Sequence, residues 1–365
     1  MPSFMPGTSS GRSVSEKPSQ PDADLVTIVI PARNEEAFIG ACLDSILVQD
    51  ESNLQVIVAD GCSSDRTTDI VREYATRDAR IELLRNEAGV VPAALNLALE
   101  AARGAWLVRV DAHATVPPDY VSRAVRHLRS GRWGAVGGRK DGIGLTPAGH
   151  AIAAAMGSKF GVGGSVYHYG TDTREVDHVP FGAYPTTLAR ELGGWDESLA
   201  VNQDFEFDRR LRERGYAILF DPDLRIDWYC RQSLRALWAQ YHRYGAGKMA
   251  VMRMHPGGVR LRHLGPPGFV MAVIAALALA PWRPRLVLLV TGSYAIALGA
   301  ASVVTARQLD DRTSKLLVPA AFAVMHTGWG LGFWRGLGRT LLGRPAAGRR
   351  QPAGSTEPQF APSRS

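Results

Sequence analysis

The sequence predicts an α/β fold with a mostly parallel sheet, followed by C-terminal transmembrane helices. Two observations predict it. Up to about residue 110, short β-branched runs alternate with segments whose apolar residues recur at helical spacing, which is the pattern of parallel strands joined by crossover helices. After Gly265, long apolar segments replace this alternation. The chain has 365 residues, 45% of them hydrophobic, which is enough for one large domain or two smaller ones.

Four short apolar runs are the predicted strands, and turn-forming residues bound them. These runs cover residues 25–30, 54–59, 81–84 and 105–110. The predicted helices lie between the strands, where apolar residues recur every three or four positions. They open at residues 32–36, begin at Thr68 to Tyr74 and cover residues 91–103. This order predicts a sheet that is covered by helices on both faces.

Polar side chains follow three of the predicted strands. Arg33 and Glu35 come after the first strand, Asp60 after the second, and Asp111 and His113 after the fourth. Because parallel strands end at one edge of a sheet, where ligands bind, we expect these side chains to converge. The alternatives are a solvated position for Arg33 and a simple turn at Asp60.

Asp111 and His113 are one residue apart and therefore lie on the same face of an extended chain. Both can reach one ligand, or one divalent ion that bridges phosphates. Alternatively, Asp111 caps the turn before Pro117 while His113 lies at a surface. The residues themselves leave both interpretations open.

The net charge is +7, and its excess is local. Basic residues between residues 225 and 263 are opposed by Asp227 alone, and they are Arg225, Arg231, Arg235, Arg243, Lys248, Arg253, Arg260 and Arg262. A basic block ahead of an apolar run suits an anionic membrane surface or a phosphate-bearing partner. No zinc spacing or nucleic-acid motif accompanies it, so we expect no nucleic-acid partner.

Cys42, Cys62 and Cys230 lack CxxC spacing, so neither a disulfide framework nor a zinc site is indicated. Residues 1–24 are rich in Ser and Pro and lack the apolar core of a signal peptide. We expect a disordered leader here.

The motifs together resemble those of glycosyltransferase family 2. The matching stretches are TIVIPARNE at 27–35, ADG at 59–61, SDRT at 64–67, ALN at 94–96, DAH at 111–113, VPFGAY at 179–184, GGWDE at 193–197 and NQD at 202–204. The resemblance spans residues 26–244. The DAHA motif and the C-terminal apolar segments are most similar to the ExoA-type enzymes of succinoglycan-like exopolysaccharide assembly.

The resemblance implies a GT-A, Rossmann-like domain over residues 25–230 that transfers a sugar with inversion from a nucleotide diphosphate, with UDP favoured. Pro31, Arg33, Glu35 and Asp60 would hold the nucleoside. Asp111 would contact the ribose or a metal ion. His113 stands where the family usually has the second acid of DxD, and imidazole favours Mn²⁺ over Mg²⁺.

Asp204 is the candidate catalytic base. Asn202 can cap the helix that follows, which places Asp204 in its first turn. Alternatively, this carboxylate only stabilises the helix through its favourable interaction with the helix dipole. The resemblance instead implies that Asp204 accepts a proton from the acceptor hydroxyl. The family often has Glu-Asp here, whereas this chain has Gln203 before Asp204.

Two further stretches are candidates for acceptor binding. Trp195 and Asp196 either wall the acceptor pocket or belong to the core. Gln240, Arg243 and Tyr244 resemble the QxxRW element of processive synthases, with Tyr in place of Trp. There Arg243 would meet the pyrophosphate, or the helix would merely pack at the membrane. We assign His168, Asp177 and His178 to loops and turns rather than to a metal site.

Residues 231–265 are predicted to form a basic amphipathic region at the membrane interface, and residues 266–335 a membrane region. Its apolar segments are 267–282, which is short, and 286–306 and 316–334, which are long enough to span. Residues 336–365 are a predicted disordered basic tail. Positive-inside reasoning keeps this tail cytoplasmic, which requires an even number of spans, so the count of spans stays open.

The catalytic domain should face the cytoplasm from a multi-pass anchor in the cell membrane. Gly328, Gly330 and Gly332 would allow close helix packing, for example in a homo-oligomer. Alternatively, these glycines are merely tolerated in the helix. The first hypothesis is an inverting transferase that adds one sugar to a polyprenyl-diphosphate-linked glycan. The alternatives are a processive polysaccharide synthase and a non-catalytic scaffold that binds nucleotide sugar.

Overall fold

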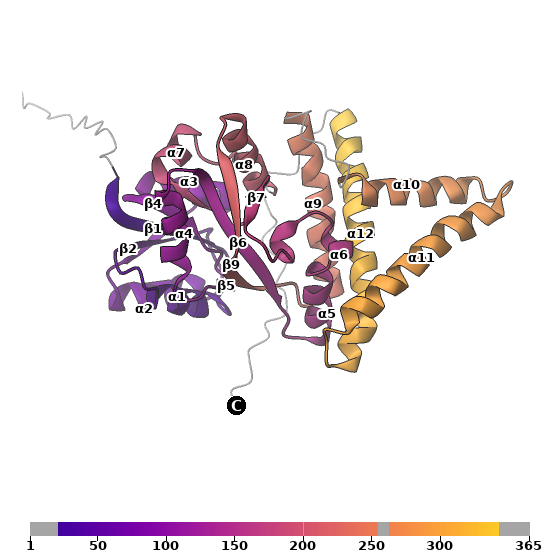
Figure 1. Cartoon of the computed structure of the whole chain (residues 1–365), viewed down its shortest axis with the longest axis horizontal. Coiled ribbons are helices and arrows are strands. Elements are labelled where there is room, and N and C mark those ends of the chain that lie inside the picture. The colour runs from indigo at the N-terminus through magenta and orange to yellow at the C-terminus, as the bar shows by residue number, and fades with distance from the viewer. Residues whose placement is uncertain (1–20, 200, 255–262, 343–365) are drawn as a thin grey trace, which may run out of the picture.

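The structure is a computed structural model that describes residues 21–199, 201–254 and 263–342. An α/β domain is followed by a group of long helices that stand beside it (Figure 1). The predicted leader falls mostly outside the described residues, but Asp22 to Asp24 already belong to the first strand. Most of the predicted tail also lies outside them.

The N-terminal half of the sheet is parallel, as predicted. Its strand order is β3-β2-β1-β4, and three helices join the strands. The strands are β1 (Asp22–Ala32), β2 (Leu54–Asp60), β3 (Ile81–Arg85) and β4 (Gly104–Arg109). The helices are α1 (Ile39–Leu47), α2 (Thr67–Arg77) and α3 (Val91–Ala101). Helix α1 begins later than predicted because Asn34 has φ 56°, a left-handed conformation that no helix contains.

The C-terminal half of the sheet is mixed, and it adds short antiparallel pairings to the predicted, mostly parallel arrangement. Strand β8 runs antiparallel between β4 and β6, whereas β6 and β9 are parallel. These strands are β5 (Ala114–Thr115), β6 (Trp133–Ile143), β7 (Arg174–Val176), β8 (Ala183–Pro185) and β9 (Ala217–Tyr229). The helices around them are α4 (Tyr120–Arg129), α7 (Thr186–Glu191) and α8 (Gln203–Glu213).

Alternating side chains of the buried strands supply a core on each face of the sheet. Ile28 and Ile30 of β1 pack on one face, whereas Val29 packs on the other with Ile57 of β2. Successive side chains of a strand point to opposite faces of the sheet. Because both faces are buried here, both sets of side chains are apolar, and each strand is a continuous apolar run in the sequence. Both faces are therefore closed, and polar chemistry is left to the strand ends.

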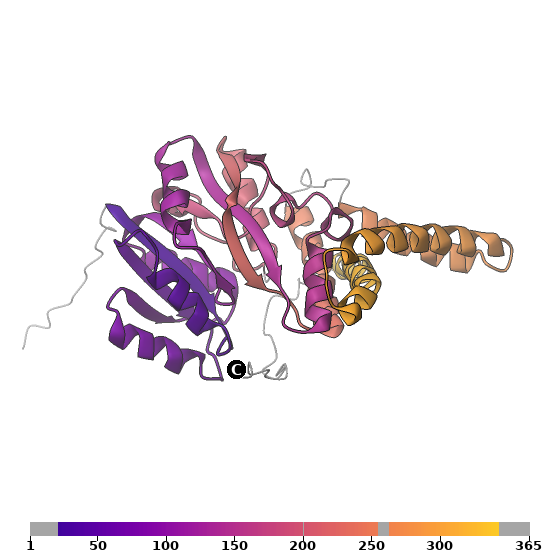
Figure 2. The ribbon, with the colours of Figure 1, turned by 60° about the horizontal axis from the view of Figure 1, so that its bottom comes forward.

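The long helices form the second part of the structure. Helices α5 (Pro147–Met156), α6 (Lys159–Val162) and α9 (Leu234–Met254) lie next to α12 (Arg312–Leu341). Helices α10 (Gly265–Ala278) and α11 (Pro284–Ala306) form a hairpin that projects from them (Figures 1 and 2). By length and composition, α11 and α12 qualify as membrane spans, and α10 is shorter. Since α12 continues to Leu341, the tail begins later than residue 336.

Glycines let α12 approach its neighbours closely. A Cβ on Gly332 or Gly336 would collide with the backbone of α9, and one on Gly330 would collide with Pro266 at the start of α10. Gly328 also faces α9, at Tyr241 and Trp238. The predicted close packing is therefore satisfied inside one chain, and these glycines no longer support a homo-oligomer.

Candidate active site

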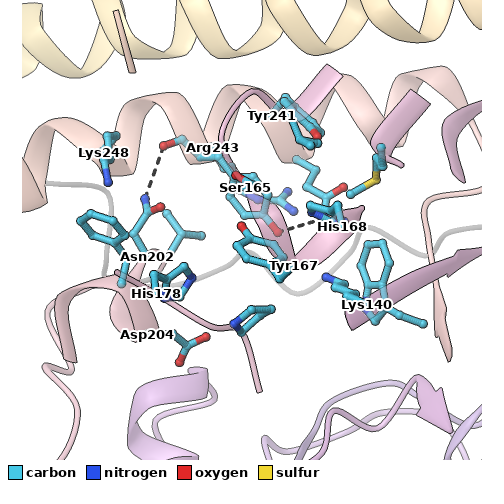
Figure 3. A pocket seen from close by; sticks show the side chains of 18 of the residues that line it. Lys140, Ser165, Tyr167, His168, His178, Asn202, Asp204, Tyr241, Arg243 and Lys248 are labelled. Carbon is cyan, nitrogen blue, oxygen red and sulfur yellow. Dashed lines mark hydrogen bonds between the residues drawn. The ribbon is translucent and has the colours of Figure 1, made fainter. Parts of the chain in front are cut away.

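One cavity of about 850 Å³ collects most of the predicted site residues. It begins at the carboxyl ends of β1 and β4 and extends to α9 and the C-terminal helices. Figure 3 shows side chains from the sheet, α8 and α9 around this space. Its walls include Pro31, Arg33, Glu35, Asp111, His113, Asp204, Gln240, Arg243 and Tyr244. Asp60, Trp195 and Asp196 do not line it.

Glycines shape one end of the cavity around Arg33. The guanidinium donates a hydrogen bond to the carbonyl of Gly89 over 2.8 Å, and Gly89 adopts φ +65°. A Cβ on Gly89 would lie 2.8 Å from Nη1 of Arg33, and one on Gly61 would lie 3.3 Å from its Cβ. The absence of side chains on both glycines therefore makes room for the side chain of Arg33 at this end of the cavity.

Asp60 is turned away from this end. Its carboxylate accepts hydrogen bonds from Ser63 and, over 3.3 Å, from the hydroxyl of Thr68. The side chain thus holds the turn that leads into α2, as the simpler alternative had it. Its neighbour Gly61 lines the cavity, and a nucleoside contact by Asp60 stays a prediction.

Arg109, which the sequence did not single out, lies at the centre of the site. Its Nε donates to Asp111 Oδ1 over 2.9 Å, and its Nη1 donates to Asp204. Only 6% of the side chain is exposed, and it packs 5.4 Å from the ring of Phe181. Burial alone would lower the pKa of Arg109, but Asp111 and Asp204 outweigh burial and raise it.

His113 is held by Glu35. Its Nδ1 lies 3.0 Å from Glu35 Oε1, and its ring lies 5.7 Å from that of Trp228. When Nδ1 carries the proton toward the carboxylate, Nε2 keeps its lone pair, which is the form that binds a metal ion. Glu35 therefore orients His113, a role that the sequence did not predict.

Asp111 and His113 fit a divalent ion shared with a substrate. Within the described ranges, no group of three or more His, Cys, Asp or Glu could hold a metal ion by itself. Ions that bind nucleotide phosphates take only one or two protein ligands and complete their shell with phosphate oxygens. Both side chains are partly exposed to the cavity, at 16% and 25%, and this donor set suits such sharing.

Asp204 lies in the first turn of α8, as predicted, but Asn202 does not cap that helix with its side chain. Asn202 has φ 63°, and its Nδ2 donates instead to the carbonyl of Tyr244 on α9 over 3.4 Å (Figure 3). The segment before Asp204 is thereby fixed to α9. Two segments that are 42 residues apart meet at the candidate base.

A lysine and two histidines also line the cavity (Figure 3). Burial lowers the pKa of Lys140 to about 8, and its Nζ lies 3.5 Å from the ring centroid of Trp228. His178 Nδ1 lies 2.7 Å from Asp208 Oδ2, and burial raises the pKa of that carboxyl although His178 opposes the rise. The assignment of His168 and His178 to plain loops missed that both line the cavity.

Trp195 belongs to the core, which is the second of the two alternatives left open for it, and it does not line the cavity. It is 2% exposed and stacks on Phe207 with ring centroids 4.5 Å apart. The backbone N–H of Trp195 donates a hydrogen bond to Oδ1 of Asn96 over 2.8 Å. This bond holds the turn around Trp195 in place. Asp196 accepts from the N–H of Ser198, and the structure keeps both residues off the cavity.

Helix α9 supplies the far wall. Gln240 donates through Nε2 to the hydroxyl of Tyr244 over 3.0 Å, and it is only 3% exposed. Its Oε1 has no hydrogen-bond partner among the described residues. A buried acceptor without a donor is costly, so this atom is suited to receive a ligand hydroxyl.

The sheet and the cavity at its strand ends define a GT-A-like domain. A family model described as glycosyl transferase family 2 matches residues 27–182. The chain is 33% identical to the succinoglycan biosynthesis protein ExoA of Rhizobium meliloti (strain 1021) over 314 residues, which are 85% of this chain and 94% of that protein. The chain belongs to glycosyltransferase family 2.

The chain is also similar to a further relative and to a solved structure. A dolichyl N-acetyl-alpha-D-glucosaminyl phosphate 3-beta-D-2,3-diacetamido-2,3-dideoxy-beta-D-glucuronosyltransferase of Methanococcus voltae is 26% identical over 70% of this chain and 81% of its own length. The mannosyltransferase PcManGT of Pyrobaculum calidifontis, solved with GDP-Man and Mn²⁺, has the same fold, with a TM-score of 0.55 and 20% identity over 88% of this chain and 91% of its own. The family and its members support glycosyltransferase activity.

Proposed function

We propose that this protein is a membrane-anchored, inverting glycosyltransferase that moves one sugar from a nucleotide-diphosphate sugar, UDP favoured, to a polyprenyl-diphosphate-linked glycan in exopolysaccharide synthesis. One observation carries the proposal. A single cavity joins the glycine-walled end at Arg33, the Asp111–Arg109–Asp204 group and the buried face of α9. Donor, reacting centre and acceptor can therefore occupy one continuous space.

The donor would lie at the sheet edge. Pro31, Arg33 and the adjoining glycines would hold the nucleoside, and Asp111 and His113 would hold a divalent ion at the diphosphate. Such an ion, when bound, neutralises the charge that grows on the leaving diphosphate. Mn²⁺ is favoured over Mg²⁺ because one ligand is an imidazole. Arg243, which lines the cavity from α9, would face the same phosphates.

Asp204 would take the proton from the attacking acceptor hydroxyl. Inversion requires a carboxylate on the side opposite the leaving group, and Asp204 comes from α8 rather than from the strand ends that hold the donor. Arg109 ties this carboxylate to Asp111 of the metal motif. That tie fixes the orientation of the base relative to the donor.

The acceptor would lie along α9. The unpartnered Oε1 of Gln240 can receive a sugar hydroxyl, and Tyr244 is held beside it. A lipid-linked acceptor is supported by the name of one relative, which acts on a dolichyl-phosphate sugar, and exopolysaccharide synthesis is supported by the name of another, which serves succinoglycan biosynthesis. The apolar helices α11 and α12 support a membrane location. The catalytic domain would lie on the cytoplasmic side.

The test is nucleoside-diphosphate release by membranes that carry the protein. A panel of nucleotide sugars is offered with and without a polyprenyl-diphosphate-linked acceptor, and with Mn²⁺, Mg²⁺ or a chelator. We expect one sugar to give acceptor-dependent release that the chelator abolishes. Donor binding without release would favour the scaffold, and products longer by several sugars would favour a processive synthase.

His113→Asp provides a matched variant for the metal. It restores the second acid of DxD, so we expect its activity with Mg²⁺ to rise relative to that with Mn²⁺. An unchanged metal preference would contradict the place of His113 in the metal site.

A further inference from the structure

The α10–α11 hairpin exposes apolar side chains along its length. Trp282 and Leu288 are each 74% exposed and Ile296 is 76% exposed, and only 6% of the apolar window of α11 is buried within the protein. In Figures 1 and 2 the hairpin projects away from the α/β domain. An exposed apolar surface of this extent indicates a site of contact with another protein or with a membrane.

Helix α12 has different surroundings, although it is also long and apolar. Of its apolar window, 44% is buried within the protein. Phe322 and Met325 pack in the main core, and His326 Nε2 lies 2.8 Å from the carbonyl of Phe160. Its glycine face is closed by α9. Protein therefore covers one side of α12 along much of its length.

The arginines of α9 limit how α12 can be oriented relative to a bilayer. Arg235 and Arg253 are exposed on α9, which runs beside α12 (Figure 1). A bilayer crossed by α12 would draw these arginines into the hydrocarbon, where charged side chains are strongly disfavoured. If α12 lies in the plane of the interface, they stay at the level of the headgroups.

We propose that the bilayer takes up only the α10–α11 hairpin, and that α12 lies along the membrane surface as the base of the catalytic body. The chain then enters and leaves the membrane on one face. Helix α10 has 14 residues and is about 21 Å long, so Trp282, Arg283 and Arg285 at the tip reach the far headgroups by snorkelling. The inference rests on the proposed membrane anchoring.

This arrangement also satisfies the charge bias of the sequence. Arg339, Arg344, Arg349 and Arg350 come after or near the end of α12. With two passes they stay on the catalytic side, as positive-inside reasoning requires. Three crossings would place them outside.

The segment between α11 and α12 distinguishes the arrangements. Gln308 is exposed there and can be replaced in a Cys62→Ser background, in which only the buried Cys42 and Cys230 remain. We expect Gln308→Cys to react with a membrane-impermeant maleimide in inside-out vesicles and not in intact cells. Wild-type Cys62, exposed on the catalytic domain, is the matched control.

Two results would overturn the inference. If Gln308→Cys is labelled from outside the cell, α11 and α12 both cross the bilayer. If it reacts only in detergent, this segment is embedded. Recovery of the protein in the soluble fraction would instead contradict the membrane anchoring itself.

A separate observation concerns the end of the cavity at the base of the hairpin. Its lining includes Phe160, Phe269, Tyr294, Met325 and Trp329, which come from α6, α10, α11 and α12. The rings of Phe269 and Tyr294 stack with centroids 4.1 Å apart. The indole N–H of Trp329 is buried and has no acceptor among the described residues. An apolar arm with one unused donor suits a lipid chain that ends in a phosphate.

We infer that this arm holds the isoprenoid-diphosphate end of the proposed acceptor, with the Trp329 N–H on a phosphate oxygen. Trp329→Phe removes only that donor. Loss of a hydrogen bond to a charged group predicts a rise of about tenfold to a hundredfold in the KM for a polyprenyl-diphosphate-linked acceptor. The KM for the donor, and turnover of the same glycan on an uncharged alkyl chain, should not change.

Trp106→Phe is the matched control, because its buried Nε1 also lacks a partner but lies off the cavity. Equal KM values for Trp329→Phe and wild type would overturn the inference. So would an equal loss with both acceptors, which would indicate a structural role. A wild type that uses no lipid-linked acceptor would contradict the proposed function.

Discussion

Arg109 joins the two carboxylates on which the proposed chemistry depends. It pairs with Asp111, which lies two residues further on and just past the end of β4, and with Asp204, which lies 95 residues further on in the sequence. The sequence offers one signal for it, a charged residue inside the apolar run at the end of β4 that shares a face with Asp111. The partner on α8 could not be read from the sequence, because only the folded sheet brings α8 to this strand.

Replacing Arg109 with Met should destabilise the protein. The change leaves two partly buried carboxylates side by side without their cation, and breaking a buried pair in this way costs about 3 kcal/mol in the free energy of unfolding. Chemical denaturation in detergent measures it. Arg72→Met removes an exposed pair with Asp69 and should cost less than about 0.5 kcal/mol. Equal losses in the two variants would show that Arg109 is not the central tie of the site.

Lys140 should give a pH dependence of stability. Burial lowers its pKa from 10.5 to about 8, with Asp111 opposing and Arg109 reinforcing the shift. Between these pH values the unfolded chain binds more protons at this site than the folded protein, so the free energy of unfolding rises with pH. Lys140→Met should therefore be more stable than wild type at pH 7. This advantage should shrink from pH 8 to 10.5 in denaturation series.

Below pH 8 the Lys140→Met difference should be constant, because Lys140 is charged in both states there. If the difference in free energy of unfolding between Lys140→Met and wild type does not change up to pH 10.5, the lowered pKa of Lys140 is contradicted.

Helix α12 is the element whose role differs most from its appearance in the sequence. Composition marks it as a membrane span, and length agrees, but its glycines and Phe322 pack it against α9 and the core. Strands β1 to β4 were easier to predict, because each is an apolar, β-branched run between turns, whereas strands β5 to β9 were not predicted. The start of α1 was harder to predict. Asn34 has a left-handed backbone conformation, and the spacing of apolar residues carries no information about it.

The contact between α9 and α12 can be tested with two glycines. A Cβ at Gly332 would meet the carbonyl of His242 on α9, whereas one at Gly299 of α11 would meet nothing within 4 Å. Gly299→Ala should be neutral, or stabilising by up to about 1 kcal/mol, through helix propensity. Gly332→Ala should lower the free energy of unfolding by about 1–3 kcal/mol and reduce turnover, because α9 carries Gln240. Thermal unfolding in detergent and an activity assay would measure both, and equal behaviour would refute the close contact.

At the scale of the whole molecule, the hairpin that we propose to enter the membrane lies on one side of the protein and the proposed donor site lies toward the other, with the cavity between them. The sequence predicted both halves separately. It could not predict that one cavity connects them, nor that Trp195 turns inward onto Phe207. These outcomes depend on how α8, α9 and the hairpin pack, which is set by contacts between distant residues.

Lysine substitutions distinguish the inserted hairpin from the surface helix. Ile296 lies at the middle of α11 and Leu316 near the start of α12, and both are exposed, at 76% and 70%. Ile296→Lys should cost about 2.5–3.5 kcal/mol of membrane insertion, whereas Leu316→Lys can reach the headgroups and should cost little. The share of protein that stays with membranes after alkaline carbonate washing measures this. Release by Leu316→Lys alone would contradict the arrangement.

The most direct test of the proposed transferase is the turnover of Asp204→Asn beside wild type, in membranes supplied with the donor, a divalent ion and the lipid-linked acceptor. Asp69→Asn, an exposed acid on α2, is the control. We predict that Asp204→Asn binds the donor as wild type does, while nucleoside-diphosphate release falls about a hundredfold or more. Turnover of Asp204→Asn equal to that of wild type and Asp69→Asn would contradict the assignment of the base and the mechanism built on it.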